Sequence, residues 1–210
     1  MATLIYVHDP MCSWCWGFAP VWQTVYSTIQ QDYQTDELTV RLVAGGLAPD
    51  SDKPMPAEMA DQIRNHWQKI EQLLGTHFNY DFWAKNIPRR STYQACRAVI
   101  AARELAGAHS ELAMITAIQQ AYYLLAENPS NDDVLLSCAE KAGLNSKHFG
   151  QFMKSPECDA LLMEEIRFAR SIGGNSFPSL FLEVAEGVHD IPVDYQNPGA
   201  ILKFISDLMR

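Results

Sequence analysis

The hydrophobic and polar positions of residues 1–48 predict a strand, a helix and a second strand. A short apolar run, Leu4–Val7, is followed by a longer helix-like stretch, Trp16–Ile29. Residues Leu38–Ala44 then alternate between apolar and polar side chains, which is typical of a half-buried strand, and the pattern stops at Gly45-Gly46. The chain therefore opens with a β-α-β unit.

Residues 49–171 show almost no strand pattern and are predicted to be helical. A proline-containing loop over residues 49–56 leads into this block. The expected helices run from Ser91-Thr92 to Gly107, from Leu112 to Leu125, from Ser130 to Gly143, from Ser146 to Met153, and from Ser155-Pro156 to Gly173-Gly174. Ser, Thr and Pro favour helix starts, and Gly favours the residue just past a helix end, so most of these boundaries have a physical reason.

Strand patterns return after Gly174. Residues Ser179–Val184 form a strand pattern, Glu186-Gly187 predicts a turn, and Val188–Ile191 predicts a short return strand. Asn197-Pro198 then begins the last helix. The whole order, β-α-β, helical block, β-β-α, predicts an α/β fold. Residues 1–48 and 172–210 are expected to form one domain, and residues 49–171 an inserted helical domain.

Composition and charge exclude several classes of partner. The 210 residues are 48% hydrophobic and 20% charged, which is ordinary for a globular protein. Sixteen Lys and Arg against 25 Asp and Glu give a net charge of −9 without a basic cluster, so nucleic acid and anionic membrane surfaces are poor candidate partners. The amino terminus has no basic region of the signal-peptide kind, and no apolar run is long enough to span a membrane. We expect a cytoplasmic protein.

Candidate chemistry enters with the run Cys12-Ser13-Trp14-Cys15, between the first strand and the first helix. Cysteines with this spacing at the first turn of a helix can form a disulfide. The first of them lies where free backbone N–H groups and the helix dipole favour a thiolate. This placement predicts a redox site with Cys12 as the nucleophile and Cys15 as the resolving thiol.

Two other interpretations of the pair remain open, a zinc site and a purely structural pair. Zinc needs two further ligands, and neither the remaining cysteines nor the six histidines show a suitable pattern, so we expect no metal. Cys96, Cys138 and Cys158 each fall on the apolar stripe of an expected helix. We expect them to be buried and to act as small hydrophobic residues.

Pro178 begins the third strand, where a proline without an N–H group is tolerated. The β-α-β plus β-β-α order, with the cysteine pair on the first helix, resembles the thioredoxin arrangement. In that arrangement a proline at the start of the third strand faces the cysteines. A cis Phe177-Pro178 bond would turn the backbone of Phe177 toward a groove in which an extended peptide can pair. The alternative is a trans proline that ends a loop.

The run from Asp9 to Phe18, Asp-Pro-Met-Cys-Ser-Trp-Cys-Trp-Gly-Phe, together with the helical block and Phe177-Pro178, resembles the DsbA-like branch of the thioredoxin superfamily. The sequence Cys-Ser-Trp-Cys-Trp-Gly-Phe within this run is similar to the motif of the cytoplasmic FrnE-like and predicted protein-disulfide isomerase members. The resemblance implies a thioredoxin-like fold with a large helical insertion and a thiol-disulfide oxidoreductase. In such a protein Cys12 attacks, Cys15 resolves and Pro178 shapes the substrate groove.

Several neighbours of the pair are candidates for supporting roles. Ser13, Trp14 and Phe177 are candidate substrate contacts, and the absence of a histidine between the cysteines argues against a very strong oxidant. His8 and Asp9, at the end of the first strand, are candidates for proton transfer with Cys15. Each has an alternative role as a residue that hydrogen-bonds within the loop.

Two other functions stay open. The glutathione-dependent isomerases and kappa-class transferases of the same branch are similar in architecture, but they lack the second cysteine. A non-catalytic client-binding protein is the other alternative. The expected partners are protein or small-molecule thiols and disulfides, with no tightly bound cofactor, glutathione as a candidate co-substrate, and a homodimer as an open hypothesis.

Overall fold

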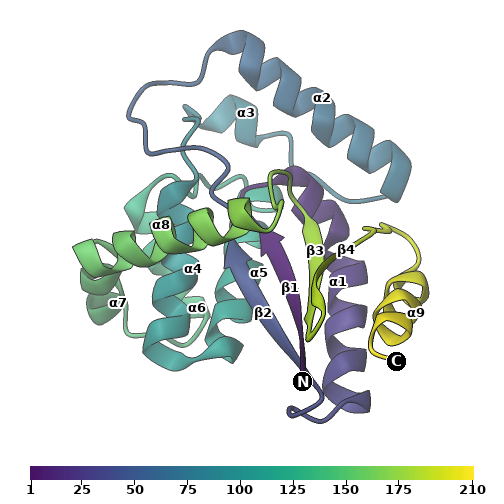
Figure 1. Ribbon diagram of the computed structural model, residues 1–210. Helices are drawn as coiled ribbons and strands as arrows, with labels where there is room; N and C mark the ends of the chain where they lie inside the picture. Colours follow the sequence, from purple (N-terminus) through teal and green to yellow (C-terminus); the bar gives the residue numbers. More distant parts are fainter.

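A four-stranded mixed β-sheet organises the fold, in a computed structural model that describes residues 1–210 (Figure 1). The strands are β1 (Ala2–His8), β2 (Leu38–Ala44), β3 (Ser179–Val184) and β4 (Gly187–Ile191), in the spatial order β2-β1-β3-β4. β2 pairs with β1 in parallel, whereas β3 is antiparallel to both β1 and β4.

The helices are α1 (Ser13–Asp32), α2 (Ala57–Leu74), α3 (Phe82–Lys85), α4 (Tyr93–Ala106), α5 (Ala108–Tyr123), α6 (Asp132–Lys141), α7 (Ser146–Met153), α8 (Pro156–Ser171) and α9 (Pro198–Leu208). Seven of them, α2 to α8, lie between β2 and β3 in the chain. None of the helices combines the length and apolar character needed to cross a bilayer.

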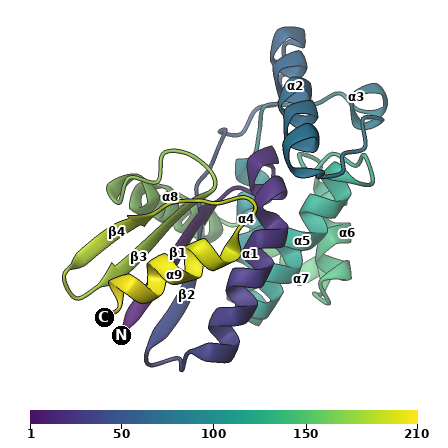
Figure 2. The same cartoon turned by 90° about the vertical axis from the view of Figure 1, so that its right-hand side faces the viewer.

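Alternate residues of β1 pack against the two faces of the sheet, as the period of two of a strand requires. Leu4 and Tyr6 lie in the core formed with α1 and α9. Ile5 and Val7 lie in a smaller cluster on the opposite face, which α8 covers through Ala169. Figure 2 shows α1 and α9 on one side of the sheet and α8 on the other. Because β1 is buried on both faces, its position fixes where the loop before α1 begins.

The helical block has its own core and is tied to the sheet. Its largest buried side chains include Trp67 and Tyr123, and its apolar cluster also includes Met11, from the loop after β1, and Ala44 of β2. Glu165 of α8 accepts a hydrogen bond of 2.6 Å from the backbone N–H of Ala44, the last residue of β2. The carboxyl end of β2 is thus held against α8.

The predicted order of elements is confirmed. The second and third strands have the predicted bounds, and Ser155 and Asn197 each cap a helix by accepting a backbone hydrogen bond. Cys96, Cys138 and Cys158 are buried, as expected of small hydrophobic residues.

Several boundaries were predicted wrongly. α1 begins at Ser13 rather than Trp16, and α5 begins directly after Gly107 and ends at Tyr123, before the predicted stop. The cap of α6 is Asn131, because the side chain of Ser130 instead donates to the carbonyl of Ser91. The sequence patterns did not separate α2 and α3 within the helical block.

Candidate functional site

Cys12 is the capping residue at the start of α1, with an extended backbone (φ −80°, ψ 119°) and no side-chain hydrogen bond to the helix. Its backbone N–H donates to the carbonyl of Asp9 at 3.0 Å, which closes the turn between β1 and α1. Cys12 is 7% exposed and Cys15 is 1% exposed. The first sulfur therefore lies at the positive end of the helix dipole while the second lies beneath it.

The two thiols differ in their electrostatic surroundings. Hydrogen bonding from the Cys15 thiol is the largest influence that lowers the pKa of Cys12, and burial opposes it. Burial raises the pKa of Cys15 well above its ordinary value, and the neighbouring Cys12 adds to this. At neutral pH the proton belongs on Cys15, and the more readily formed thiolate is that of Cys12.

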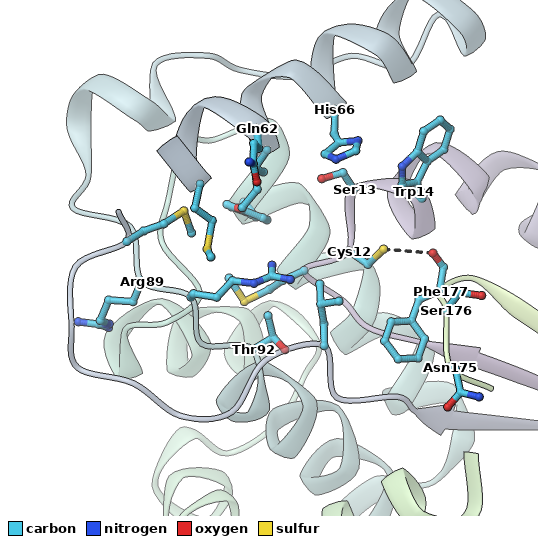
Figure 3. A pocket seen from close by; sticks show the side chains of 17 residues that line it. Cys12, Ser13, Trp14, Gln62, His66, Arg89, Thr92, Asn175, Ser176 and Phe177 are labelled. Carbon is cyan, nitrogen blue, oxygen red and sulfur yellow. Dashed lines mark hydrogen bonds between the residues drawn. The ribbon is translucent and has the colours of Figure 1, made fainter. Parts of the chain in front are cut away.

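The segment before β3 faces Cys12 from the other side. The Phe177–Pro178 peptide bond is cis. The Sγ of Cys12 donates to the carbonyl oxygen of Phe177 at 3.4 Å (Figure 3). The phenyl ring of Phe177 in turn rests on Gly45, where an added Cβ would lie only 1.9 Å from the ring.

Asp9 is fully buried and organises the loops around the cysteines. Its carboxylate accepts hydrogen bonds from the backbone N–H groups of Met11 and Leu47, both at 2.8 Å, and from the hydroxyl of Thr92 at 2.7 Å. The Cys96 thiol donates to it as well, at 3.4 Å. Burial raises the pKa of Asp9, whereas these hydrogen bonds lower it. Asp9 is thus placed as a hydrogen-bonding residue of the loop, which was one of the two predicted alternatives.

His8 is buried and its Nε2 has no hydrogen-bond partner. Burial, reinforced by the positive charge of Arg103, lowers the pKa of His8 to about 3. The imidazole is therefore neutral at physiological pH. A group with such a low pKa is a weak base for a thiol proton.

The two residues between the cysteines have different surroundings. Ser13 Oγ accepts a hydrogen bond of 3.0 Å from the indole N–H of Trp67, a residue of α2. Trp14 is half-buried and meets Tyr195 edge-on, with ring centroids 5.4 Å apart. The hydrogen bond to Ser13 thus helps to hold α2 over the start of α1, and Trp14 lies at the edge of the space in front of Cys12.

A cavity of about 410 Å³ opens in front of Cys12. Figure 3 shows the side chains around it, with α2 above, the helical block beside it and the Phe177 segment opposite. Its lining residues are Met11, Cys12, Ser13, Trp14, Leu47, Met55, Met59, Gln62, Ile63, His66, Arg89, Arg90, Thr92, Tyr122, Asn175, Ser176 and Phe177. Nine of these 17 residues come from the helical block, which therefore forms more than half of the wall.

The sequence patterns missed the contribution of the helical block to the site. Thr92 was recognised only as a residue at a helix start, and Trp67 and Arg90 carried no signal. Each lies at least 50 residues from Cys12 in the chain, so only tertiary packing brings it to the site. Glu183 of β3 is exposed, so it is not a carboxylate buried under the cysteine pair.

The fold and the site define a class of protein. A sheet of order β2-β1-β3-β4, a buried cysteine pair at the start of α1 and a facing cis-proline segment are the parts of a thioredoxin-fold thiol-disulfide oxidoreductase. The family of the DSBA-like thioredoxin domain matches residues 3–191. The chain belongs to this family, whose members generally have oxidoreductase activity.

Two solved structures are similar over nearly the whole chain. A candidate protein disulfide isomerase from Nitrosomonas europaea is 26% identical, with a TM-score of 0.85, and the match covers 99% of this chain and 97% of that one. The cytosolic disulfide reductase DsbM from Pseudomonas aeruginosa is 24% identical, with a TM-score of 0.77 and 98% of each chain covered. DsbM has also been solved with glutathione. At this identity the likeness to DsbM concerns the fold alone.

The curated relatives are longer proteins. The ClpXP adapter protein SpxH from Halalkalibacterium halodurans is 29% identical over 150 residues, which are 70% of this chain and 47% of the relative. The chain spans about half the length of the curated relatives it matches.

Proposed function

We propose that this protein is a thiol-disulfide oxidoreductase in which Cys12 is the nucleophile and Cys15 the resolving thiol. The observation that carries the proposal is the position of the Cys12 sulfur. It lies at the amino terminus of α1 and at the wall of a cavity, with the Cys15 thiol beneath it and the Phe177 carbonyl 3.4 Å away. This arrangement supports attack by Cys12 on a disulfide held in the cavity.

The reductive reaction has two exchange steps. The Cys12 thiolate attacks one sulfur of a substrate disulfide, a Cys12–substrate disulfide forms, and the other substrate sulfur leaves as a thiolate. Cys15 then loses its proton and attacks Cys12, which releases the second substrate thiolate and leaves a Cys12–Cys15 disulfide. Two thiols of the glutathione class restore the dithiol. The first attacks the Cys12–Cys15 disulfide and forms a mixed disulfide, the second releases the first as a small-molecule disulfide, and the two protons go to Cys12 and Cys15. The reverse sequence oxidises a substrate dithiol.

The surroundings of Cys12 favour the reducing direction. No cationic side chain stands between the cysteines. The charge of Asp9 opposes the lowering of the Cys12 pKa by the Cys15 hydrogen bond, and it adds to the rise that burial causes in the pKa of Cys15. A less stable thiolate makes the disulfide less oxidising. We therefore place the potential closer to the thioredoxin value of about −270 mV than to about −120 mV. Such a reductant suits the cytoplasm, where thiols are kept reduced.

Arg90 is a candidate binding residue for a carboxylate-bearing substrate such as glutathione. Its guanidinium borders the cavity and is half-buried, and it forms neither a salt bridge nor a hydrogen bond within the chain. Arg89, next to it, donates hydrogen bonds to the carbonyl of Ser130 and to the side-chain oxygen of Asn131. An unpaired guanidinium is a ready partner for a carboxylate, which it can bind in bidentate geometry.

Client binding is a second candidate, because SpxH relatives are adapter proteins. Trp14 and the methionines of the cavity offer an apolar surface for a client. A pure adapter needs neither sulfur, so it would keep its full function in the Cys12→Ser variant. A glutathione-dependent isomerase or transferase would need Cys12 or a hydroxyl at its position, but not Cys15.

The deciding experiment equilibrates the protein in graded glutathione redox buffers and counts free thiols by mass-tagged alkylation. We expect one cooperative two-thiol transition, lost in both Cys12→Ser and Cys15→Ser and kept in Cys138→Ser, a buried cysteine of α6. Accumulation of a stable glutathione adduct on Cys12 without an internal disulfide would overturn the dithiol mechanism. Arg90→Gln should raise the KM for glutathione, the electron donor, more than it lowers kcat.

A further inference from the structure

A second cavity lies along the flank of α1. It has a volume of about 690 Å³, against about 410 Å³ for the groove in front of Cys12, and no residue borders both. Its walls come from α1, from α5 and from the loop after α2. In Figure 2, α5 lies beside α1, with α2 above both. The second cavity is therefore separate from the proposed substrate groove.

The walls of this cavity combine aromatic and aliphatic side chains with uncharged polar ones and with His77 and His109. α1 contributes Trp16, Trp22 and Tyr26, and α5 contributes Leu112 and Ile115. No Lys, Arg, Asp or Glu borders it, although the chain has a net charge of −9. The groove in front of Cys12 differs, because two arginines border that groove. Since burial of an unpaired charge is costly, the second cavity suits an uncharged ligand.

Polar groups without partners border the apolar walls. Gln119 is only 5% exposed, and its side-chain amide forms no hydrogen bond with another residue of the chain. Pro20 of α1 has no N–H, so the carbonyl of Trp16 lacks its usual donor four residues along the helix. Buried polar groups are normally hydrogen-bonded, so both groups are candidate anchors for the polar end of a ligand.

The cavity reaches the redox pair from behind. Cys15 borders it together with the ring of Tyr6, a residue of β1. Tyr6 also contacts Trp22, with ring centroids 4.3 Å apart. A molecule in the cavity would therefore contact residues that pack directly against the resolving thiol.

We propose that this cavity is a ligand site for an uncharged aromatic molecule with a hydroxyl or amide N–H group. Its rings pack among Trp16, Trp22 and Ile115, and its polar group hydrogen-bonds to Gln119. This inference does not depend on the direction or the substrate of the proposed redox reaction. Because the ligand contacts Cys15, its affinity differs between the dithiol and disulfide forms, and by linkage it shifts the midpoint of the redox titration.

The test uses 2-naphthol, which is neutral at pH 7, and naphthalene-2-sulfonate as its charged counterpart, by titration calorimetry on the full chain. We expect one molar equivalent of naphthol to bind and the sulfonate not to bind. Gln119→Leu should weaken naphthol binding about tenfold, the worth of one hydrogen bond. Ala113→Trp, which fills the cavity from α5, should abolish binding. The matched control is Gln62→Leu, the same change in the other cavity, which should leave affinity unchanged.

Alkylation of Cys15 gives a second measurement that needs no redox activity. In the Cys12→Ser chain, bound naphthol should slow alkylation of the peptide that contains Cys15 severalfold, as read by mass spectrometry. Absence of binding at millimolar naphthol, unchanged binding in a folded Gln119→Leu chain, or loss of binding in Gln62→Leu would each overturn the proposal. Circular dichroism establishes that each variant is folded.

Discussion

At the scale of single residues, Asp9 connects the geometry of the site to its electrostatics. Its carboxylate accepts hydrogen bonds from the loop before α1, from the loop after β2 and from the start of α4. The same charge disfavours a thiolate at Cys12 and at Cys15. One residue thus holds the cysteine loop in place and limits how acidic the nucleophile becomes.

The substitution Asp9→Asn separates these two effects. The amide side chain would keep one acceptor oxygen and lose the charge, so the pKa of Cys12 should fall while the protein loses about 1–3 kcal/mol of stability from unpaired N–H groups. The pKa is read from the pH dependence of Cys12 alkylation, and stability from urea unfolding.

Thr92→Val is the control for the substitution at Asp9. It removes one donor to the carboxylate but keeps the charge, so it should cost stability without lowering the pKa of Cys12. If the pKa of Cys12 is the same in the Asp9→Asn variant as in the natural chain, Asp9 does not act on the nucleophile through its charge.

At the scale of elements, close approaches at two glycines position the segments around the site. A Cβ on Gly17 of α1 would lie 2.9 Å from Ile70 Cγ2, so this glycine lets α2 lie close against α1. Gly45, directly after β2, has the ring of Phe177 in the space of its missing side chain. The first glycine supports the roof of the groove, and the second supports the segment that faces Cys12.

Gly45→Ala should push the Phe177 ring out of place. We expect a loss of about 1–3 kcal/mol of stability, as for overpacking in a core, and slower reaction of Cys12 with a disulfide substrate. In the Phe177→Ala background the same substitution should cost much less, because the clashing ring is gone. Urea unfolding of the four chains of this double-mutant cycle measures the coupling.

Gly150→Ala provides the comparison for Gly45→Ala. Its new Cβ would meet only the flexible end of Leu136, at 2.9 Å, and it lies inside α7, where Ala is favoured over Gly. Stability should therefore stay level or rise. Equal losses at Gly45 and Gly150 would argue against a specific role for the ring of Phe177.

The elements that the sequence predicted best are those with strong local signals. β2 and β3 have clear strand patterns, and α8 and α9 begin with capping residues followed by proline. α2 has apolar residues at helical spacing, Ile63, Trp67 and Ile70 among them. Its cap residue, Pro56, makes no side-chain hydrogen bond, so the start of this helix has no capping signal. The cysteine pair and Phe177-Pro178 could be predicted from local sequence. Trp67, Arg90 and Thr92 could not, since their roles arise from contacts between distant segments.

At the scale of the whole molecule, a buried charge cluster joins the helical block to the sheet. Arg103 of α4 pairs with Glu111 of α5 at 3.0 Å and with Glu165 of α8 at 2.6 Å. Glu165 also accepts from the backbone at the end of β2. Burial, the largest influence, raises the pKa of Glu111 from 4.5 to about 7 and outweighs the attraction of Arg103.

This raised pKa makes global stability depend on pH. The folded protein holds a proton on Glu111 more strongly than the unfolded chain, so the contribution is present below pH 4.5 and is lost as the pH rises toward 7. We expect a decline of about 3 kcal/mol across this window, measured by urea unfolding at several pH values. Glu111→Gln, which cannot ionise, should flatten the decline, with a residual slope from Glu165, whose pKa burial also raises.

Glu104→Gln serves as the control for this pH dependence. Glu104 also pairs with Arg103, at 3.1 Å, but its side chain is exposed. The decline in stability should therefore persist in this variant. If Glu111→Gln leaves the slope as steep as in the natural chain, other groups cause the pH dependence.

The lack of acidic and capping side chains at the start of α1 affects the thermal stability of the two redox forms. This helix of 20 residues has no acidic residue in its first turn, and its cap residue Cys12 makes no side-chain hydrogen bond to the helix. Within the cap and the first turn, a thiolate on Cys12 is therefore the one group that can place negative charge at the helix start, and forming the disulfide removes it. The dithiol form should melt at a higher temperature than the disulfide form above the pKa of Cys12, and the difference should shrink below it. The difference in melting temperature between the two forms, measured by calorimetry, would thus show how much folding favours the dithiol over the disulfide.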